Sequence, residues 1–384
     1  MTVRFHPFAL ERLLSQWENR VAYNLSESGV HPLALGELVT DAAGVEALLR
    51  TPLTYPQTNG LPELRERIAA LYPGSTPEQI VVTNGCAEAN FNTLQTVAGA
   101  GDEIALMRPN YMQLWGVAQN AGIDVRTFAL EESRAWALDL NALEAAVGPR
   151  TKVVAVCNPN NPTGHILTER EMAQVVAAAE RVGAWLLADE VYAGAERVRR
   201  EVTPSFWGRY DRVLATGGLS KAYGLPGLRI GWVVAPPEVA AQIWARQDYT
   251  TISSSMLSNK LAAIALAPEV RARLLERSRG YVSRGFAQLA GWVEQHRDRL
   301  SLGSADAGAI GFVRYDLPIG SIELCERLLA EQNVLAVPGD HFGIDRHLRL
   351  NHGLPSAYVQ AGLDRIWNTM SACLENPPEV HTPR

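Results

Sequence analysis

The sequence has few cysteines, no excess of positive charge and no long uninterrupted apolar segment. Its four cysteines are widely spaced and form no C-x-x-C pair, so the sequence indicates neither a disulfide framework nor a zinc site, and we expect no bound metal. Thirty-five basic and 41 acidic residues leave a formal charge of −6. This balance disfavours nucleic acid and anionic membrane surfaces as partners.

Several motifs that define other classes of protein are also missing. The most apolar stretch, residues 172–188, is interrupted by Glu180 and Arg181, and the first twenty residues lack the apolar core of a secretory signal. The glycine pattern that starts at Gly99 has Ile104 where a dinucleotide fingerprint needs its third glycine. No phosphate-loop, zinc-protease or nucleophile-elbow motif occurs. We therefore expect a cytoplasmic protein that acts on or binds a small molecule.

The middle of the chain alternates short apolar runs with helical patterns. Continuous apolar runs of this length are typical of strands buried on both faces, as in a parallel sheet. Alternation of strands and helices favours an α/β layer architecture. Strands are predicted at Ile80–Thr83, Glu103–Met107, Val153–Cys157, Trp185–Ala188, Arg212–Thr216 and Ile230–Val234, and helices at Leu61–Leu71, Ala87–Ala98, Glu169–Arg181 and Pro237–Arg246.

The last hundred residues show a different pattern, which predicts a smaller α+β domain. A long helix is expected over Pro268–Gln295, with shorter strands at Gly311–Tyr315 and His347–Leu350 and a helix at Ser321–Glu331. A chain of 384 residues is long enough for two or three domains. We predict a large domain over residues 48–283 and a small domain over residues 284–384 that residues 1–47 join.

Unusual polar residues follow four of the predicted strands. In open α/β sheets, ligands bind beyond the carboxyl ends of the strands. Each segment taken alone is an ordinary turn or helix cap, but four of them at one edge of a sheet predict a binding site. The segments are Asn84–Glu88, the N-P-N-N-P-T-G sequence of Asn158–Gly164, Asp189–Tyr192, and Gly217–Arg229 with Ser220 and Lys221.

These residue types match the chemical needs of pyridoxal phosphate. A lysine amine can hold a carbonyl cofactor as a Schiff base and later move protons at the α-carbon of a substrate. A carboxylate can pair with a protonated pyridine nitrogen, and an amide and a phenol can hydrogen-bond the ring hydroxyl. Backbone amides at the start of a helix, together with a hydroxyl and an arginine, can hold a phosphate.

From about Tyr55 to Arg349 the chain resembles the fold-type I pyridoxal-phosphate enzymes of the class I/II aminotransferase family. The resemblance is carried mainly by the N-P-x-N-P-T-G segment and by the Ser-Lys pair, whose Lys221 stands eight residues before Arg229. It implies that Lys221 forms the Schiff base and that Asp189 pairs with the pyridine nitrogen. The other cofactor contacts it implies are Asn161 and Tyr192 at the ring hydroxyl, Cys86, Ala87, Ser220 and Arg229 at the phosphate, and Tyr111 on the ring face.

The same resemblance implies a substrate clamp and a homodimer. Arg349 matches the arginine that binds the substrate α-carboxylate, beside Asn161. Tyr55 matches a tyrosine that reaches the phosphate in the neighbouring subunit. One residue departs from the family pattern: Gly218 stands where a hydroxyl residue often donates to the phosphate.

A narrower resemblance concerns the loop Leu25–Pro32. It is similar to the corresponding loop of capreomycidine synthase and of oxygen-dependent arginine oxidases, which implies an arginine-like substrate. A carboxylate such as Glu27 is the natural partner of a guanidinium. His31 could move protons beyond the reach of Lys221 or stabilise a reduced oxygen species.

The type of reaction stays open at this stage. Removal of the α-proton by Lys221 can lead to transamination, to elimination with cyclisation, or to electron transfer to oxygen. We expect transamination, with Lys221, Asp189 and Tyr192 as catalytic residues, because it is the common outcome in the family. Oxidation of arginine and cyclisation of the capreomycidine synthase type are the alternatives. A non-catalytic binding protein is a remote alternative, because regulators that use this fold carry an added DNA-binding domain and we expect none in this sequence.

Overall fold

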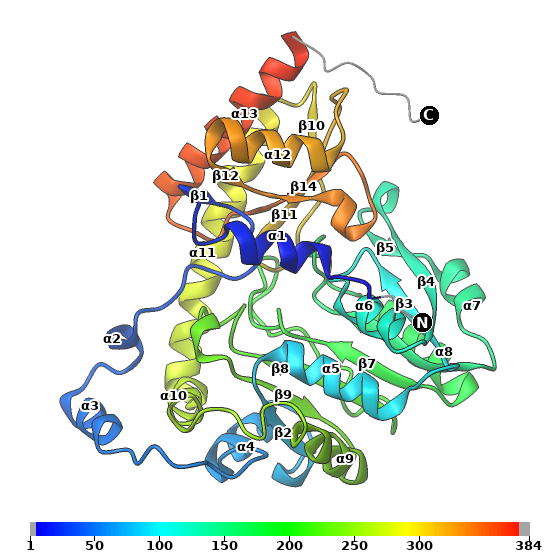
Figure 1. Cartoon of the computed structure of the whole chain (residues 1–384), viewed down its shortest axis with the longest axis vertical. Coiled ribbons are helices and arrows are strands. Elements are labelled where there is room, and N and C mark those ends of the chain that lie inside the picture. The colour runs from blue at the N-terminus through cyan, green and yellow to red at the C-terminus, as the bar shows by residue number, and fades with distance from the viewer. Residues whose placement is uncertain (1–4, 376–384) are drawn as a thin grey trace.

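The computed structural model describes residues 5–375 (Figure 1). Residues 1–4 and 376–384, which belong to the predicted N-terminal segment and small domain, lie outside the described residues. The large domain is built on an eight-stranded sheet. Its strands, in spatial order, are β2 (Ile80–Thr83), β9 (Gly231–Val234), β8 (Val213–Gly218), β7 (Trp185–Asp189), β6 (Thr151–Cys157), β3 (Glu103–Arg108), β4 (Asp124–Glu131) and β5 (Ala137–Leu138).

All six strands predicted for the middle of the chain are present, which confirms the expected α/β class. Strands β3, β6, β7 and β8 run parallel, whereas β9 is antiparallel to both of its neighbours. The start of β9 therefore lies at the edge where the parallel strands end. Strand β4 was not predicted, because it contains no continuous apolar run and only Phe128 and Leu130 of its residues are buried.

Helices cover both faces of the large sheet, since alternate residues of its strands belong to two separate apolar clusters. One face packs against α5 (Cys86–Val97), α6 (Gln113–Asn120) and α9 (Pro237–Gln247). The other packs against α4 (Pro62–Ala69), α7 (Leu140–Ala146), α8 (Glu169–Val182) and α10 (Met256–Leu266). No described helix combines the length and the hydropathy that crossing a bilayer requires.

The small domain contains a four-stranded antiparallel sheet. Its strands, in order, are β10 (Leu300–Leu302), β11 (Ile310–Tyr315), β14 (His347–Asn351) and β13 (Val337–Pro338). Helices α12 (Ser321–Gln332) and α13 (Ser356–Glu375) pack with it around a second core. The long helix α11 (Pro268–Gln295) runs alongside both domains (Figure 1). The predicted boundary at residues 283 and 284 falls inside this helix, and the domain limits stay a prediction.

The N-terminal segment connects to the C-terminal part of the chain. Strand β1 (Tyr23–Asn24) pairs in parallel with β12 (Val334–Leu335). Helix α1 (Ala9–Trp17) crosses between the two domains, and the short helices α2 (Leu35–Leu38) and α3 (Ala42–Leu49) project from the side of the molecule (Figure 1). Short 3-10 helices occur at Pro77–Gln79, Glu132–Arg134, Pro226–Leu228 and Gly339–Phe342.

Candidate active site

A cavity of about 330 Å³ lies at the carboxyl edge of the large sheet, between α1 and the two domains. It is lined by every residue predicted for the site except His31 and Tyr55. These lining residues are Glu27, Cys86, Ala87, Tyr111, Asn161, Asp189, Tyr192, Ser220, Lys221, Arg229 and Arg349. They come from the N-terminal loop, the carboxyl ends of five strands of the large sheet (β2, β3, β6, β7 and β8) and strand β14, so the chain brings together residues that are far apart in sequence.

Asp189, the last residue of β7, is a buried carboxylate that faces this cavity. Its Oδ2 accepts a hydrogen bond from the Asn90 amide at 2.8 Å, and its Oδ1 accepts one from the Val191 backbone at 3.1 Å. Thr216 donates to Asn90 Oδ1 at 2.8 Å, which sets the orientation of that amide. Burial raises the pKa of Asp189, and the hydrogen bond from Asn90 opposes this rise.

The start of helix α5 forms a positively polarised corner of the cavity. Gly85 precedes the helix with a φ of +84°, in the region that favours glycine. A Cβ there would lie 2.3 Å from an Arg229 guanidinium nitrogen, so a side chain at this position would displace the guanidinium from the start of the helix. The free N–H groups of a helix start and a guanidinium together suit a phosphate. This corner therefore fits the predicted phosphate site of Cys86, Ala87, Ser220 and Arg229.

Lys221 follows β8, and its amine lies 3.6 Å from Glu27 Oε2. Glu27 comes from the N-terminal loop and lines the same cavity. The ammonium of Lys221 lowers the pKa of Glu27, although burial opposes this effect. Glu27 is therefore an anion paired with the lysine at neutral pH.

Arg349 in β14 is a fully buried cation, and no carboxylate within residues 5–375 is in direct contact with it. Its side chain is 1% exposed and donates to neutral oxygens, Asn161 Oδ1 at 3.1 Å and the backbone carbonyl of Ser26. Among the described residues, its Nε finds no hydrogen-bond partner. Burial lowers the pKa of Arg349. Because an unpaired buried charge costs about 3–5 kcal/mol, this group is suited to binding an anion from the cavity.

Two phenols complete the walls of the cavity. Tyr192 is buried and donates to the Ser28 hydroxyl at 2.9 Å, and burial raises the pKa of Tyr192. Tyr111 donates to the Glu11 carboxylate of α1 at 2.6 Å. Helix α1 thus holds the tyrosine that is predicted to lie on the cofactor ring.

His31 and Tyr55, the other two predicted site residues, lie outside this cavity. His31 lines an adjoining cavity, where its ring lies 5.7 Å from that of Tyr281, centre to centre. Burial and the nearby Arg277 lower the pKa of His31. Tyr55 is 79% exposed and does not line the cavity of its own chain. Their predicted roles, a second proton carrier and a contact to the neighbouring subunit, stay predictions.

The sequence analysis missed two acidic residues of the site, Glu11 and Glu18, which line the cavity with Glu27. They lie seven residues apart, at the start and the C-cap of α1, on the same side as the buried Leu10 and Leu14. Burial and the neighbouring carboxylates raise the pKa of Glu18. Carboxylates on the apolar side of an amphipathic helix were the signal that could have revealed them.

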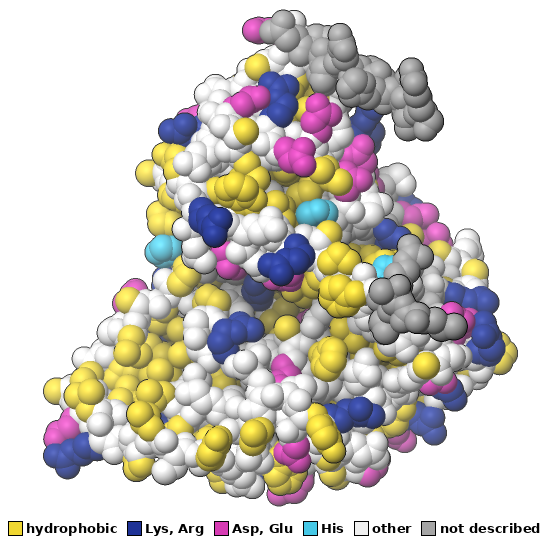
Figure 2. Space-filling model, viewed as in Figure 1, with side chains coloured by type: hydrophobic (Ala, Val, Ile, Leu, Met, Phe, Trp, Pro, Cys, Tyr) yellow, Lys and Arg dark blue, Asp and Glu magenta, His cyan; other side chains and the backbone are white. Residues whose placement is uncertain are grey.

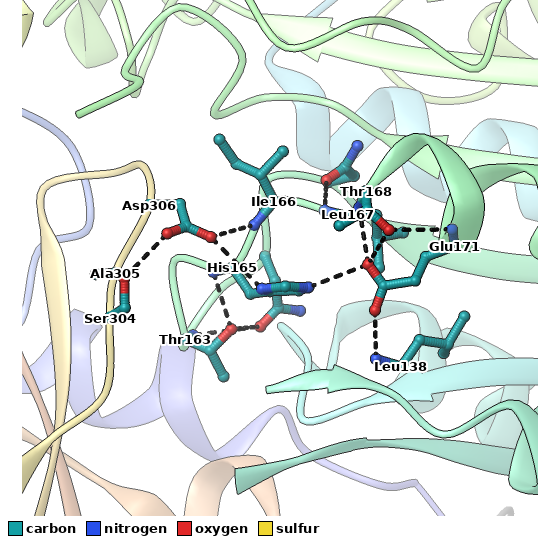
Figure 3. A network of polar contacts seen from close by, with 12 residues as sticks. Leu138, Thr163, His165, Ile166, Leu167, Thr168, Glu171, Ser304, Ala305 and Asp306 are labelled. Atoms are coloured by element: carbon teal, nitrogen blue, oxygen red, sulfur yellow. Dashed lines mark hydrogen bonds and ion pairs between the residues drawn. The ribbon is translucent and has the colours of Figure 1, made fainter. Parts of the chain in front are cut away.

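The loop that carries Asn161 is fastened by a buried histidine (Figure 3). The His165 ring lies between two carboxylates, with Nδ1 3.5 Å from Asp306 and Nε2 3.6 Å from Glu171. Burial disfavours the charged ring, but the two carboxylates outweigh it and raise the pKa of His165 to about 9. At neutral pH an imidazolium therefore joins this loop to α8 and to the small domain.

The residues of the cavity fit pyridoxal phosphate. The backbone N–H groups at the start of α5, beside Arg229, suit the phosphate. The buried Asp189 suits the pyridine nitrogen, and the Lys221 amine suits the aldehyde. A mostly parallel sheet with these groups at its carboxyl edge defines a pyridoxal-phosphate enzyme of fold type I.

The chain belongs to the family described as aminotransferase class I and II, whose sequence model matches residues 35–366. Its cofactor is accordingly pyridoxal 5'-phosphate. Capreomycidine synthase of Streptomyces vinaceus is 31% identical over 350 residues, which cover 89% of this chain and 88% of the synthase.

Solved structures give the same result for the fold. A pyridoxal-phosphate-dependent aminotransferase from Streptococcus suis is similar with a TM-score of 0.90 and 31% identity, over 97% of this chain and 99% of that one. The pyridoxal-phosphate-dependent cyclase OrfR is similar with a TM-score of 0.86 and 28% identity, over 96% of this chain and 98% of the cyclase.

Proposed function

We propose that the protein acts at the α-carbon of a basic, arginine-like L-amino acid by aminotransferase chemistry. The observation that carries this proposal is the charge distribution of one cavity. A buried, unpaired Arg349 lies in it together with Glu11, Glu18 and Glu27. A molecule with an α-carboxylate and a distal cation complements both groups.

When bound, pyridoxal phosphate supplies an electron sink that weakens the α-C–H bond of an attached amino acid. We assign its phosphate to the start of α5 with Ser220 and Arg229, and its pyridine nitrogen to Asp189. We assign Asn161 and Tyr192 to the ring hydroxyl. These contacts leave the Lys221 amine to bind the aldehyde and, when released, to take the α-proton and return it at a neighbouring carbon.

The substrate side chain is assigned to the three glutamates. Glu27 is paired with Lys221 in this structure, and it loses that cation when the lysine amine is used to hold the cofactor. A carboxylate left without its partner favours another cation, and a planar guanidinium can bind two carboxylates at once. Glu11 is already engaged by Tyr111, so Glu18 and Glu27 are the better placed acceptors.

Cyclisation or oxygen-dependent oxidation of arginine is the second candidate function. It is favoured by the 31% identity to capreomycidine synthase and by the structural similarity to the cyclase OrfR. It would need a proton carrier for carbons beyond the reach of Lys221, which the sequence analysis assigned to His31. His31 lines the adjoining cavity and not the cavity that holds Lys221.

One incubation separates these reactions. The holoenzyme is given L-arginine with and without 2-oxoglutarate, in air and under argon. Transamination predicts glutamate and a keto acid, and multiple turnovers only with 2-oxoglutarate. Oxygen uptake and peroxide without 2-oxoglutarate would instead support the oxidase. A parallel incubation with 3-hydroxy-L-arginine, whose β-hydroxyl can leave as water, tests the cyclase, and a ring product from that compound would support it. If aspartate or aromatic amino acids are preferred, the assignment of the glutamates is wrong.

We also propose that the active protein is a homodimer. Residues 35–55, which include α2 and α3, expose large apolar side chains, and Figure 2 shows hydrophobic side chains over the region that these helices occupy in Figure 1. The exposed large side chains are Leu35, Val45, Leu49, Leu53 and Tyr55. Apolar patches of this kind commonly mark interfaces. Light scattering should give twice the chain mass, and Tyr55→Phe should weaken cofactor retention without changing that mass.

A further inference from the structure

A second cavity adjoins the active site and is larger than it. Its volume is about 660 Å³, against about 330 Å³ for the first. Glu18, Glu27, Ser220 and Pro226 line both cavities, so the two adjoin at these residues. Since ligand pockets usually measure about 300–1,000 Å³, the cofactor alone takes up much of the first cavity. A substrate side chain that extends past Glu27 therefore enters the second.

The lining of the second cavity suits an uncharged group. No lysine or arginine of the part of the chain that the structure describes lines it. Its polar side chains are largely engaged by the backbone: Asn351 donates to the Gly29 carbonyl at 2.9 Å, and the Tyr358 hydroxyl accepts from the Asn24 N–H at 2.6 Å. Val30, Pro32, Leu354 and Pro355 supply apolar surface. Anionic groups are disfavoured where the second cavity meets the first, because the carboxylates of Glu18 and Glu27 lie there.

We propose that the second cavity is a subsite for the far end of the substrate, which rests on the proposed function. In this arrangement the substrate cation lies between Glu18 and Glu27, and a neutral substituent on that cation occupies the second cavity. The enzyme would then accept basic amino acids that are longer than arginine, such as arginines alkylated on the terminal nitrogen.

The experiment compares L-arginine with Nω-propyl-L-arginine, which keeps the guanidinium charge. Gly227→Leu narrows the second cavity from the large-domain side, where a Cβ meets no atom within 4 Å. Asn19→Trp narrows it from the N-terminal segment, at an exposed position. Gly291→Leu, at an exposed helical glycine that is equally free of neighbours, is the matched control. Values of kcat/KM are measured for both compounds. Binding is measured separately, as the concentration of each compound that produces half of the maximal change in cofactor absorbance.

The expected result is selective. The wild type and Gly291→Leu should use both compounds within a few-fold of each other, and each narrowed variant should lose at least tenfold on the propyl compound while keeping arginine within twofold. Equal losses on both compounds would show that the cavity is only an entrance, and no loss on either would show that it is not occupied; both outcomes overturn the proposal. A wild type that uses neither compound but turns over acidic or aromatic amino acids would instead refute the proposed function.

Discussion

Replacing His165 by Gln should lower the free energy of unfolding at neutral and acidic pH, because it removes a positive charge that stabilises the folded protein. At alkaline pH the histidine is neutral and the effect should disappear. The pKa of His165 is raised to about 9 in the folded protein, against 6.5 for the unperturbed side chain. A group with a raised folded pKa contributes its full stability below the unfolded pKa and loses it as pH rises through the folded pKa. The pH window for His165 is therefore about 6.5 to 9.

The size of the effect follows from this shift. The difference between a pKa of about 9 in the folded protein and 6.5 in the unfolded chain corresponds to about 3.4 kcal/mol, at 1.36 kcal/mol for each pKa unit. The ring nitrogens lie 3.5 and 3.6 Å from the carboxylates, which is longer than a good charged hydrogen bond. We therefore expect about 1–3 kcal/mol at pH 6, falling towards zero at pH 10.

The assay is urea unfolding of the wild type and the variant at both pH values, with His6→Gln as a control. The backbone of His6, and not its ring, makes its hydrogen bonds to Asn120. The measured quantity is the difference in unfolding free energy between wild type and variant. If the difference for His165→Gln is the same at pH 6 and pH 10, the ring is not charged in the folded protein and the reasoning is refuted.

Three further predictions concern the cavity. Lys221→Ala should lose the violet absorbance of the bound cofactor, which the exposed Lys152→Ala should keep; an unchanged spectrum would contradict the assignment of the lysine. Asn90→Ala removes a hydrogen bond of 2.8 Å to Asp189 and should raise the pKa of that carboxyl further. We therefore expect weaker cofactor binding and a shift in the pH at which the absorbance of the bound cofactor changes. Asn92→Ala, at a buried asparagine of the same helix, should leave that pH dependence unchanged, and equal behaviour of the two variants would argue against a specific role. Glu27→Gln should weaken arginine binding about tenfold and spare neutral amino acids; this is less than the usual cost of about 2–5 kcal/mol for a buried charge pair, because 41% of the Glu27 side chain is exposed.

The sequence predicted the large sheet well because its strands are buried on both faces. Val153–Cys157 and Trp185–Ala188 are continuous apolar runs whose strand character does not depend on their neighbours. The antiparallel direction of β9 was not predictable in this way, since Gly231–Val234 has the same apolar pattern as a parallel strand.

The site was predictable where a residue follows a strand, and less so where tertiary packing brings the residue in. Lys221 and Asp189 could be identified from their place after apolar runs. Asn90 could not, because it lies in the middle of a helix and only the packing of α5 on the sheet brings it to Asp189. His31 was predicted beside the substrate from its loop alone, and the structure places it in the adjoining cavity.

The pairing of β1 with β12 has a consequence for how the protein is made. Ala22, next to β1, donates to the side chain of Asn333, which follows it by 311 residues. At synthesis rates of about 5–20 residues per second, the N-terminal loop waits roughly 15–60 seconds for its partner strand to leave the ribosome. The large sheet is complete by Val234, so it can form during that interval. Glu27 and Arg349 come together only at the end of translation, so a nascent chain forms the corner between α5 and Arg229 long before the cavity is closed by the N-terminal loop and β14.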